Sequence, residues 1–126
     1  MEPARTDLTT AEDIDRLLRA FYADVLRDAD LAPHFDGVVM DTHIPHIATF
    51  WHMVVLGERS YTGDPMTVHE RLHARRPLRT RDFDRWLALF VRTVDAHFAG
   101  PKAEMIKERA RAIAPLMALQ VGAIAG

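Results

Sequence analysis

The feature that most constrains this chain is a run of apolar residues with helical spacing near its start. The run contains Ile14, Leu17, Leu18, Phe21, Tyr22, Val25 and Leu26. Intervals of three and four residues place all of them on one face of an α-helix. Thr9 or Thr10 can cap the first turn, and the pattern stops around Asp28. The sequence therefore predicts an amphipathic first helix.

A second helix is expected from about Thr42 to Val55, after a tight connector over residues 31–37 that Pro33 and Gly37 mark. Pro45 is compatible with this helix because we place it in the first turn, where its missing N–H has no partner to lose. The expected buried face consists of His43, Ile47, Phe50 or Trp51, and Val54.

Two later helices follow the same logic. Thr80 is expected to cap a third long helix, and Gly100-Pro101 to close it and start the last one. The third helix would bury Phe83, Trp86, Leu87, Phe90, Val94 and Phe98. The last would bury Ile106, Ala110, Ile113, Met117 and Val121, with a kink at Pro115.

No segment alternates apolar and polar residues with the period of a strand, so we predict an all-α fold with helices packed at crossing angles. The 126 residues suit a single domain spanning 1–126. A net charge of −2 gives no bulk attraction to nucleic acid or an anionic membrane. No apolar run approaches the ~20 residues of a membrane span, and no signal peptide is recognisable. We expect a cytoplasmic protein.

Three residues on the apolar faces carry hydrogen-bond donors. Tyr22 lies on the first face, His43 begins the second and Trp86 is central on the third. Buried donors need partners. Each could bond a backbone carbonyl separately, which is the simpler interpretation for any one of them. If the three converge, they form a polar pocket in an apolar cavity, able to hydrogen-bond a small ligand on a metal.

His69 is the candidate metal ligand. Asp64 and Pro65 can start a short helix, on which Met66 and Leu72 place His69 on the apolar side. Neutral imidazole is the commonest protein ligand of haem iron, so His69 could hold haem while the three donors face its ligand. A solvated helix residue is the alternative for His69.

Other kinds of site are less well supported. The pairs His43/His46 and His69/His73 have spacings that could chelate zinc, but no third ligand is evident. With no cysteine, the chain cannot form disulfides, thiolate metal sites or covalently attached haem, so any haem is non-covalent. The only serine is Ser60, and no phosphate-binding loop occurs. His34, His52 and His97 look like surface or boundary residues. A cofactor-free helical interaction module remains the second hypothesis.

Taken together, four segments resemble the truncated haemoglobin family, specifically its group III. They are Phe21-Tyr22-Ala-Asp-Val25 continuing to Leu31-Ala-Pro-His-Phe35, His43-Ile-Pro45 with Phe50-Trp51, Tyr61-Thr-Gly-Asp-Pro-Met66 leading to His69, and Phe83-Asp-Arg-Trp86 continuing to Phe90. They span nearly the whole chain. The resemblance implies a shortened globin, a two-over-two helical sandwich around haem b.

The resemblance also assigns roles to individual residues. It implies that His69 binds the iron and that Tyr22, His43 and Trp86 face the ligand on the opposite, distal side. It further implies haem-packing positions at Phe35, Ile47, Phe50, Trp51, Met66 and Leu72. His46 falls where the family often has a residue facing a haem propionate.

These expectations define a function. We expect binding of dioxygen or another small ligand, such as nitric oxide, carbon monoxide or sulfide. A pocket rich in donors should retain dioxygen, which favours sequestration, sensing or redox detoxification over simple transport. Dioxygenase- or peroxidase-like turnover would require an external reductase, because no flavin or nicotinamide motif is present. Whether the chain is an enzyme stays open.

Overall fold

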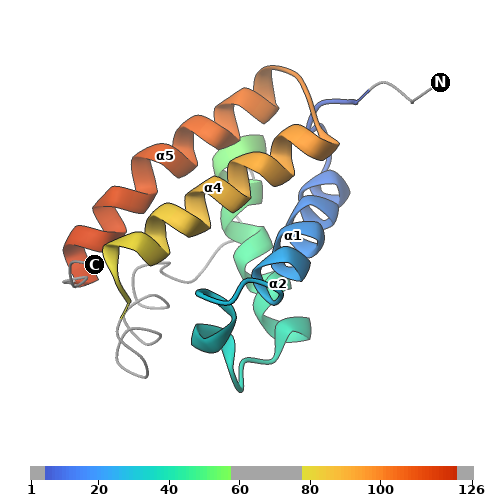
Figure 1. Ribbon diagram of the computed structural model, residues 1–126. Coiled ribbons are helices and arrows are strands. Elements are labelled where there is room, and N and C mark those ends of the chain that lie inside the picture. Colours follow the sequence, from blue (N-terminus) through green and yellow to red (C-terminus); the bar gives the residue numbers. More distant parts are fainter. Residues whose placement is uncertain (1–4, 58–77, 122–126) are drawn as a thin grey trace.

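The computed structural model describes residues 5–57 and 78–121, with only the backbone described for 117, 120 and 121. Within these residues no strand forms, and an isolated bridge joins Thr6 to Phe98. The helices are α1 (Ala11–Val25), the short 3-10 helix η1 (Ala32–Phe35), α2 (Met40–Trp51), the π-helix η2 (His52–Leu56), α4 (Thr80–His97) and α5 (Pro101–Val121) (Figure 1). The predicted all-α class is confirmed.

Helix α1 begins with a reciprocal cap. The Thr10 hydroxyl accepts the N–H of Asp13, and the Asp13 carboxylate accepts the N–H of Thr10. Desolvation opposes ionisation of Asp13, but hydrogen bonds from Arg16 and the cap lower its pKa to about 2. The carboxylate therefore stays charged and able to accept. The predicted face is buried from Ile14 to Val25, but Leu26 is 47% exposed because the helix has already ended at Val25.

Helix α2 begins two residues before the predicted start. The carbonyl of Val39 accepts the N–H groups of Thr42 and His43, so the first turn forms over Met40. Pro45 therefore lies inside the helix rather than in its first turn, and the placement made from the sequence was wrong. The helix continues into η2, and Gly57 ends that segment with a φ of 76°, a value that favours glycine.

The start of α4 also differs from expectation, because the cap is Arg79 rather than Thr80. The carboxylate of Asp82 accepts the N–H of Arg79 at 2.8 Å. The turn at Gly100-Pro101 is confirmed. A Cβ at Gly100 would lie 2.6 Å from the side chain of Asp7, which caps α5 by accepting its first N–H groups. Pro115 lies inside α5, which continues past it.

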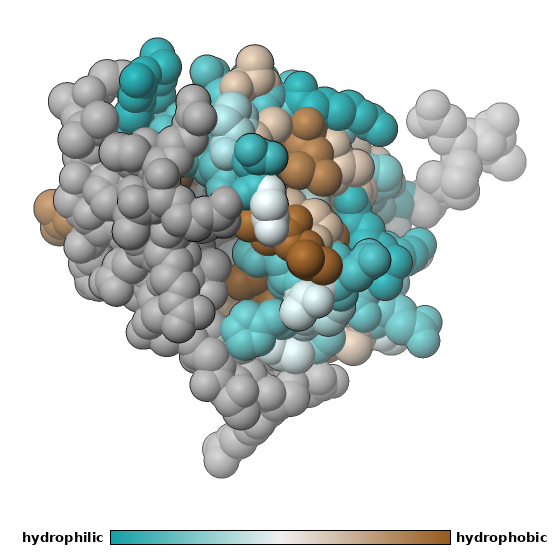
Figure 2. Space-filling view, turned by 90° about the horizontal axis from the view of Figure 1, so that it is seen from below, coloured by the Kyte–Doolittle hydropathy of each residue, from teal (hydrophilic) through white to brown (hydrophobic). Residues whose placement is uncertain are grey.

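The helices form two layers around one core. Helices α4 and α5 run side by side, and α1 and α2 pack across them (Figure 1). The largest fully buried side chains are Phe21, Phe90, Leu8, Ile14, Leu17, Leu18, Ile106, Val25 and Val94. Four aromatic rings meet at the centre, since Phe90 stacks on Trp51 and Trp86 and takes an edge contact from Phe21. On the face shown in Figure 2, hydrophobic residues are exposed in patches among hydrophilic ones.

The alanine variant of Thr10 should lower the free energy of unfolding by about 1 kcal/mol, because the N–H of Asp13 loses its acceptor. Urea unfolding followed by circular dichroism measures the change. The serine variant keeps the hydroxyl and should stay close to the parent. Equal losses in the two variants would show that the cap does not stabilise α1.

Candidate functional site

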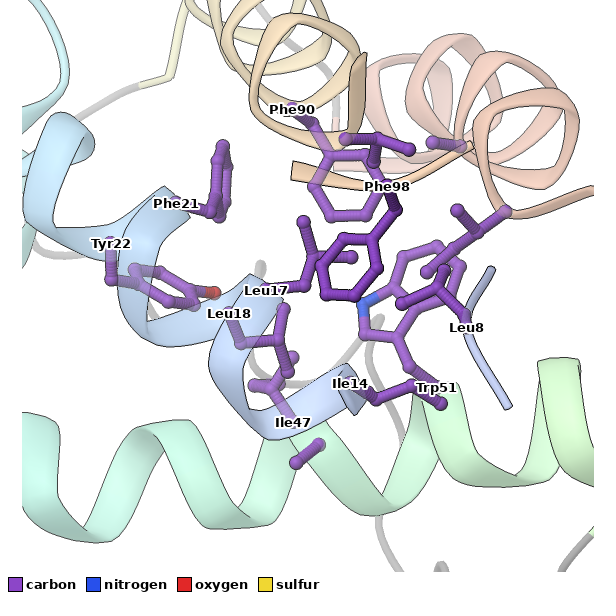
Figure 3. Packing of buried hydrophobic residues seen from close by; sticks show 14 of the residues in the cluster. Leu8, Ile14, Leu17, Leu18, Phe21, Tyr22, Ile47, Trp51, Phe90 and Phe98 are labelled. Carbon is purple, nitrogen blue, oxygen red and sulfur yellow. The ribbon is translucent and has the colours of Figure 1, made fainter. Parts of the chain in front are cut away.

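Two of the three predicted donors meet directly. The hydroxyl of Tyr22 lies 3.2 Å from Nε2 of His43, so the pair joins α1 to α2 by a hydrogen bond. Tyr22 is 5% exposed and His43 is half-buried. Figure 3 shows the Tyr22 ring at the edge of the core, on the same helix as Phe21. Tyr22 and His43, whose convergence the sequence left open, therefore do meet.

The ring of Phe35 contacts both members of this pair. Its centroid lies 5.8 Å from that of Tyr22 and 5.7 Å from that of His43, both in edge-on geometry. Because η1 carries Phe35, three separate segments contribute to one small cluster. Edge-on contacts of this kind hold rings at defined angles.

Trp86 joins the cluster through Phe21. The Trp86 ring stacks on Phe90 with centroids 5.3 Å apart, and it meets the Phe21 ring edge-on at 5.7 Å. Phe21 in turn meets Tyr22 at 5.0 Å. Trp86 is half-buried, so it lies at the boundary of the core. The structure thus places all three predicted donors on one continuous aromatic cluster.

The remaining predicted contact residues differ in their surroundings. Ile47 is buried, and Trp51 is 3% exposed and stacked on Phe90 in the core (Figure 3). Phe50 is half-buried against Trp51. His46 is exposed, and its carbonyl accepts the Thr49 hydroxyl. The predicted residues Met66, His69 and Leu72 lie outside the described residues, as does His73 of the possible zinc pair.

The Tyr22 hydroxyl keeps its proton. Burial raises the pKa of the Tyr22 phenol far above its ordinary value, so the side chain is a neutral donor at any physiological pH. One phenol can donate one hydrogen bond and accept others, yet its single partner in the described part of the chain is His43. Tyr22 therefore has hydrogen-bonding capacity to spare for a ligand.

The tautomer of His43 decides how that capacity is used. If Nε2 carries the hydrogen, His43 donates to the Tyr22 oxygen and leaves the phenol hydrogen free. If Nε2 is bare, Tyr22 donates to it, and a ligand must compete for that hydrogen. In either arrangement the two side chains satisfy one another without a ligand, so burying the Tyr22 hydroxyl beside His43 costs little.

Two histidines that the sequence predicts at the surface or its boundary are in fact buried and paired with acids. Nε2 of His34 lies 3.2 Å from Oδ2 of Asp82, and Nε2 of His52 lies 3.0 Å from Oδ1 of Asp15. Their exposures are only 6% and 9%. No local pattern joins such distant positions. His97 is exposed, as expected.

The described residues fit a flat apolar group with a polar ligand. They bring aromatic rings and hydrogen-bond donors together, and Tyr22 has spare hydrogen-bonding capacity. They do not form a zinc-like cluster, because no group of three metal-ligating side chains occurs within residues 5–57 and 78–121. Across the same ranges, no helix is long and apolar enough to span a membrane.

Comparison with known proteins defines the class. A family model described as bacterial-like globin matches residues 7–119. The group 3 truncated hemoglobin ctb of Campylobacter jejuni is 31% identical over 109 residues, covering 82% of this chain and 84% of that protein. The crystal structure of group III truncated hemoglobin from Campylobacter jejuni superposes with a TM-score of 0.83 at 27% identity, covering 94% of this chain and 95% of that one.

The chain therefore belongs to the bacterial-like globin family and, within it, to the group III truncated haemoglobins. The predicted resemblance and the shortened globin fold are both confirmed. Membership of this family implies haem and iron as the cofactor and a small gas molecule as the ligand. It favours a haem protein over a cofactor-free helical module.

Burial of Tyr22 can be tested by alkaline titration. In a Tyr61→Phe variant Tyr22 is the only tyrosine, and ultraviolet absorbance should show no phenolate near pH 10, where a free phenol titrates. The unfolded chain loses this proton at a lower pH than the folded chain. The contribution of the neutral phenol to the free energy of unfolding is therefore complete below about pH 10 and is lost as the pH rises further. Ionisation of Tyr22 near pH 10 in the folded protein would contradict its burial.

Proposed function

We propose that this chain holds haem b non-covalently, that His69 would be the iron ligand, and that hydrogen bonds from Tyr22, His43 and Trp86 would retain a small ligand. The hydrogen bond between Tyr22 and His43 is the observation that carries the proposal. Phe35, Ile47, Phe50, Trp51, Met66 and Leu72 would pack on the haem, and His46 would face a propionate.

The chain's own residues determine what happens to the ligand. Haem, when bound, would supply iron able to take a diatomic molecule such as dioxygen, nitric oxide or carbon monoxide. The Tyr22 hydroxyl is held in place by Phe35 and His43, so it can donate without a large rearrangement. Fixed donors of this kind favour a ligand that gains negative charge over one that stays neutral.

Retention favours certain roles over others. A ligand held by several donors dissociates slowly, which suits sequestration, sensing or redox detoxification better than simple transport. Repeated redox turnover would need electrons from a separate reductase, because the sequence holds no flavin or nicotinamide motif. We place the protein in the cytoplasm as one domain spanning 1–126, in keeping with its composition and charge.

The His69→Ala variant should lose the haem absorption band of the purified protein or shift it, since alanine offers iron no ligand. Visible spectra of oxidised and reduced protein report the change. His73→Ala removes the histidine four residues further along the sequence and should keep the parent spectrum. His97→Ala, at an exposed position of α4, is the matched control. If His73→Ala rather than His69→Ala altered the band, the assignment of the iron ligand would be wrong.

The Tyr22→Phe variant keeps the ring and removes the donor. Losing one hydrogen bond to a charged partner is worth roughly 1.5–3 kcal/mol, so dioxygen should dissociate about ten to a hundred times faster. Stopped-flow measurement of dissociation gives the rate. Thr93→Val deletes another buried hydroxyl, one bonded to the carbonyl of Leu89, and should leave the rate unchanged. An unchanged rate in Tyr22→Phe would mean that Tyr22 does not face the ligand.

A further inference from the structure

The connector between α1 and α2 is tied to the start of α4 at two points. His34, in η1, has its Nε2 3.2 Å from Oδ2 of Asp82, a distance within hydrogen-bond range. Asp28, which precedes η1, accepts Nε of Arg85 at 2.5 Å. Both anchoring positions on α4 lie within four residues of Trp86.

The first of these ties is deeply buried. The side chains of His34 and Asp82 are 5% and 6% exposed. Phe35 follows His34 and Phe83 follows Asp82 in the sequence, and Phe35 packs against the small apolar cluster of Leu78 and Phe83. A polar pair placed among apolar side chains interacts strongly, because water does not compete for it.

One nitrogen of His34 has no hydrogen-bond partner within residues 5–57 and 78–121. Nδ1 is buried and makes no hydrogen bond, which is costly for a polar atom. The opposite nitrogen faces Asp82, whose Oδ2 also accepts the N–H of Arg79 at the start of α4. The structure thus tolerates one unsatisfied atom where an apolar side chain would have avoided it.

The contact between His34 and Asp82 links the two segments that carry Phe35 and Trp86. Both rings belong to the aromatic cluster of Tyr22, His43, Phe35, Phe21 and Trp86, called here the distal cluster. Phe35 follows His34 directly and contacts Tyr22 and His43. Trp86 follows Asp82 by one helical turn, so it lies on the same side of α4. Moving His34 away from Asp82 would change the spacing between the Phe35 side and the Trp86 side of the cluster.

We propose that His34 and Asp82 form a latch that positions the two walls of the ligand pocket, with His34 acting as a positioning residue that does not itself touch the ligand. This rests on the proposed function for its effect on ligands, but the arrangement of the rings is a property of the chain alone. Asp28 and Arg85 support the latch from the other end of the connector.

The test replaces His34 with leucine, which fills the space and removes the contact. Ligand dissociation should become roughly three to ten times faster, a partial loss of one hydrogen bond. Fluorotryptophan labelling gives a second readout, because the chain has only Trp51 and Trp86. In the fluorine NMR spectrum the Trp86 resonance should move, while that of Trp51, set in the core, should stay in place.

Two further variants separate positioning from mere stability. His34→Gln returns an amide N–H toward Asp82 and should restore both readouts in part. Asp82→Asn keeps an acceptor for the N–H of Arg79 and, if His34→Leu fails to fold, should show smaller changes in the same direction.

The latch is overturned if the Trp86 resonance does not move in a folded variant, or if both tryptophan resonances broaden together as the fold loosens. Failure of the parent protein to take up haem would instead end the proposed function. The fluorine spectrum would still decide whether His34 and Asp82 position Trp86.

Discussion

The enclosure of Phe90 determines how the helices can be arranged. This ring is fully buried and lies between the rings of Trp51 and Trp86, with Phe21 meeting it edge-on. The four side chains come from α1, α2 and α4, so their contact distances fix how these helices cross. Aromatic pairs favour few geometries and bury a large area, so a shift of one helix would disturb several contacts at once.

The contacts of this aromatic centre also determine the geometry of the distal cluster. Tyr22 follows Phe21 on α1, so fixing the Phe21 ring also places the phenol beside α2, where His43 meets it. Placing the buried Tyr22 hydroxyl beside the half-buried His43 costs little free energy only while both partners are satisfied. The chain meets that condition by pairing the two donors with one another, which leaves Tyr22 neutral, oriented and able to accept a further partner. Preorganised donors lose little energy to rearrangement when a ligand arrives.

Local physical rules account for what the sequence predicted and for what it missed. The helical period identified the buried faces of α1 and α4, and the turn at Gly100-Pro101 followed from backbone preferences. The period alone left open whether Tyr22, His43 and Trp86 converge, since it cannot orient one helix on another. The start of α2 was missed because the carbonyl of Val39 begins the helix without a recognisable cap. The pairs His34–Asp82 and His52–Asp15 depend on tertiary contact between distant segments.

The central claim is that this aromatic and polar cluster forms one wall of a haem pocket. A titration of hemin into the haem-free protein, followed by tryptophan fluorescence, tests it most directly. Because Trp86 lies at the boundary of the core beside Phe21, the account predicts saturable quenching that reaches its limit at one hemin per chain. Because we also place Trp51 on the haem, the remaining fluorescence of a Trp86→Phe variant should be quenched with the same limit of one hemin per chain. Weak, unsaturable quenching that is the same with and without Trp86 would contradict the account.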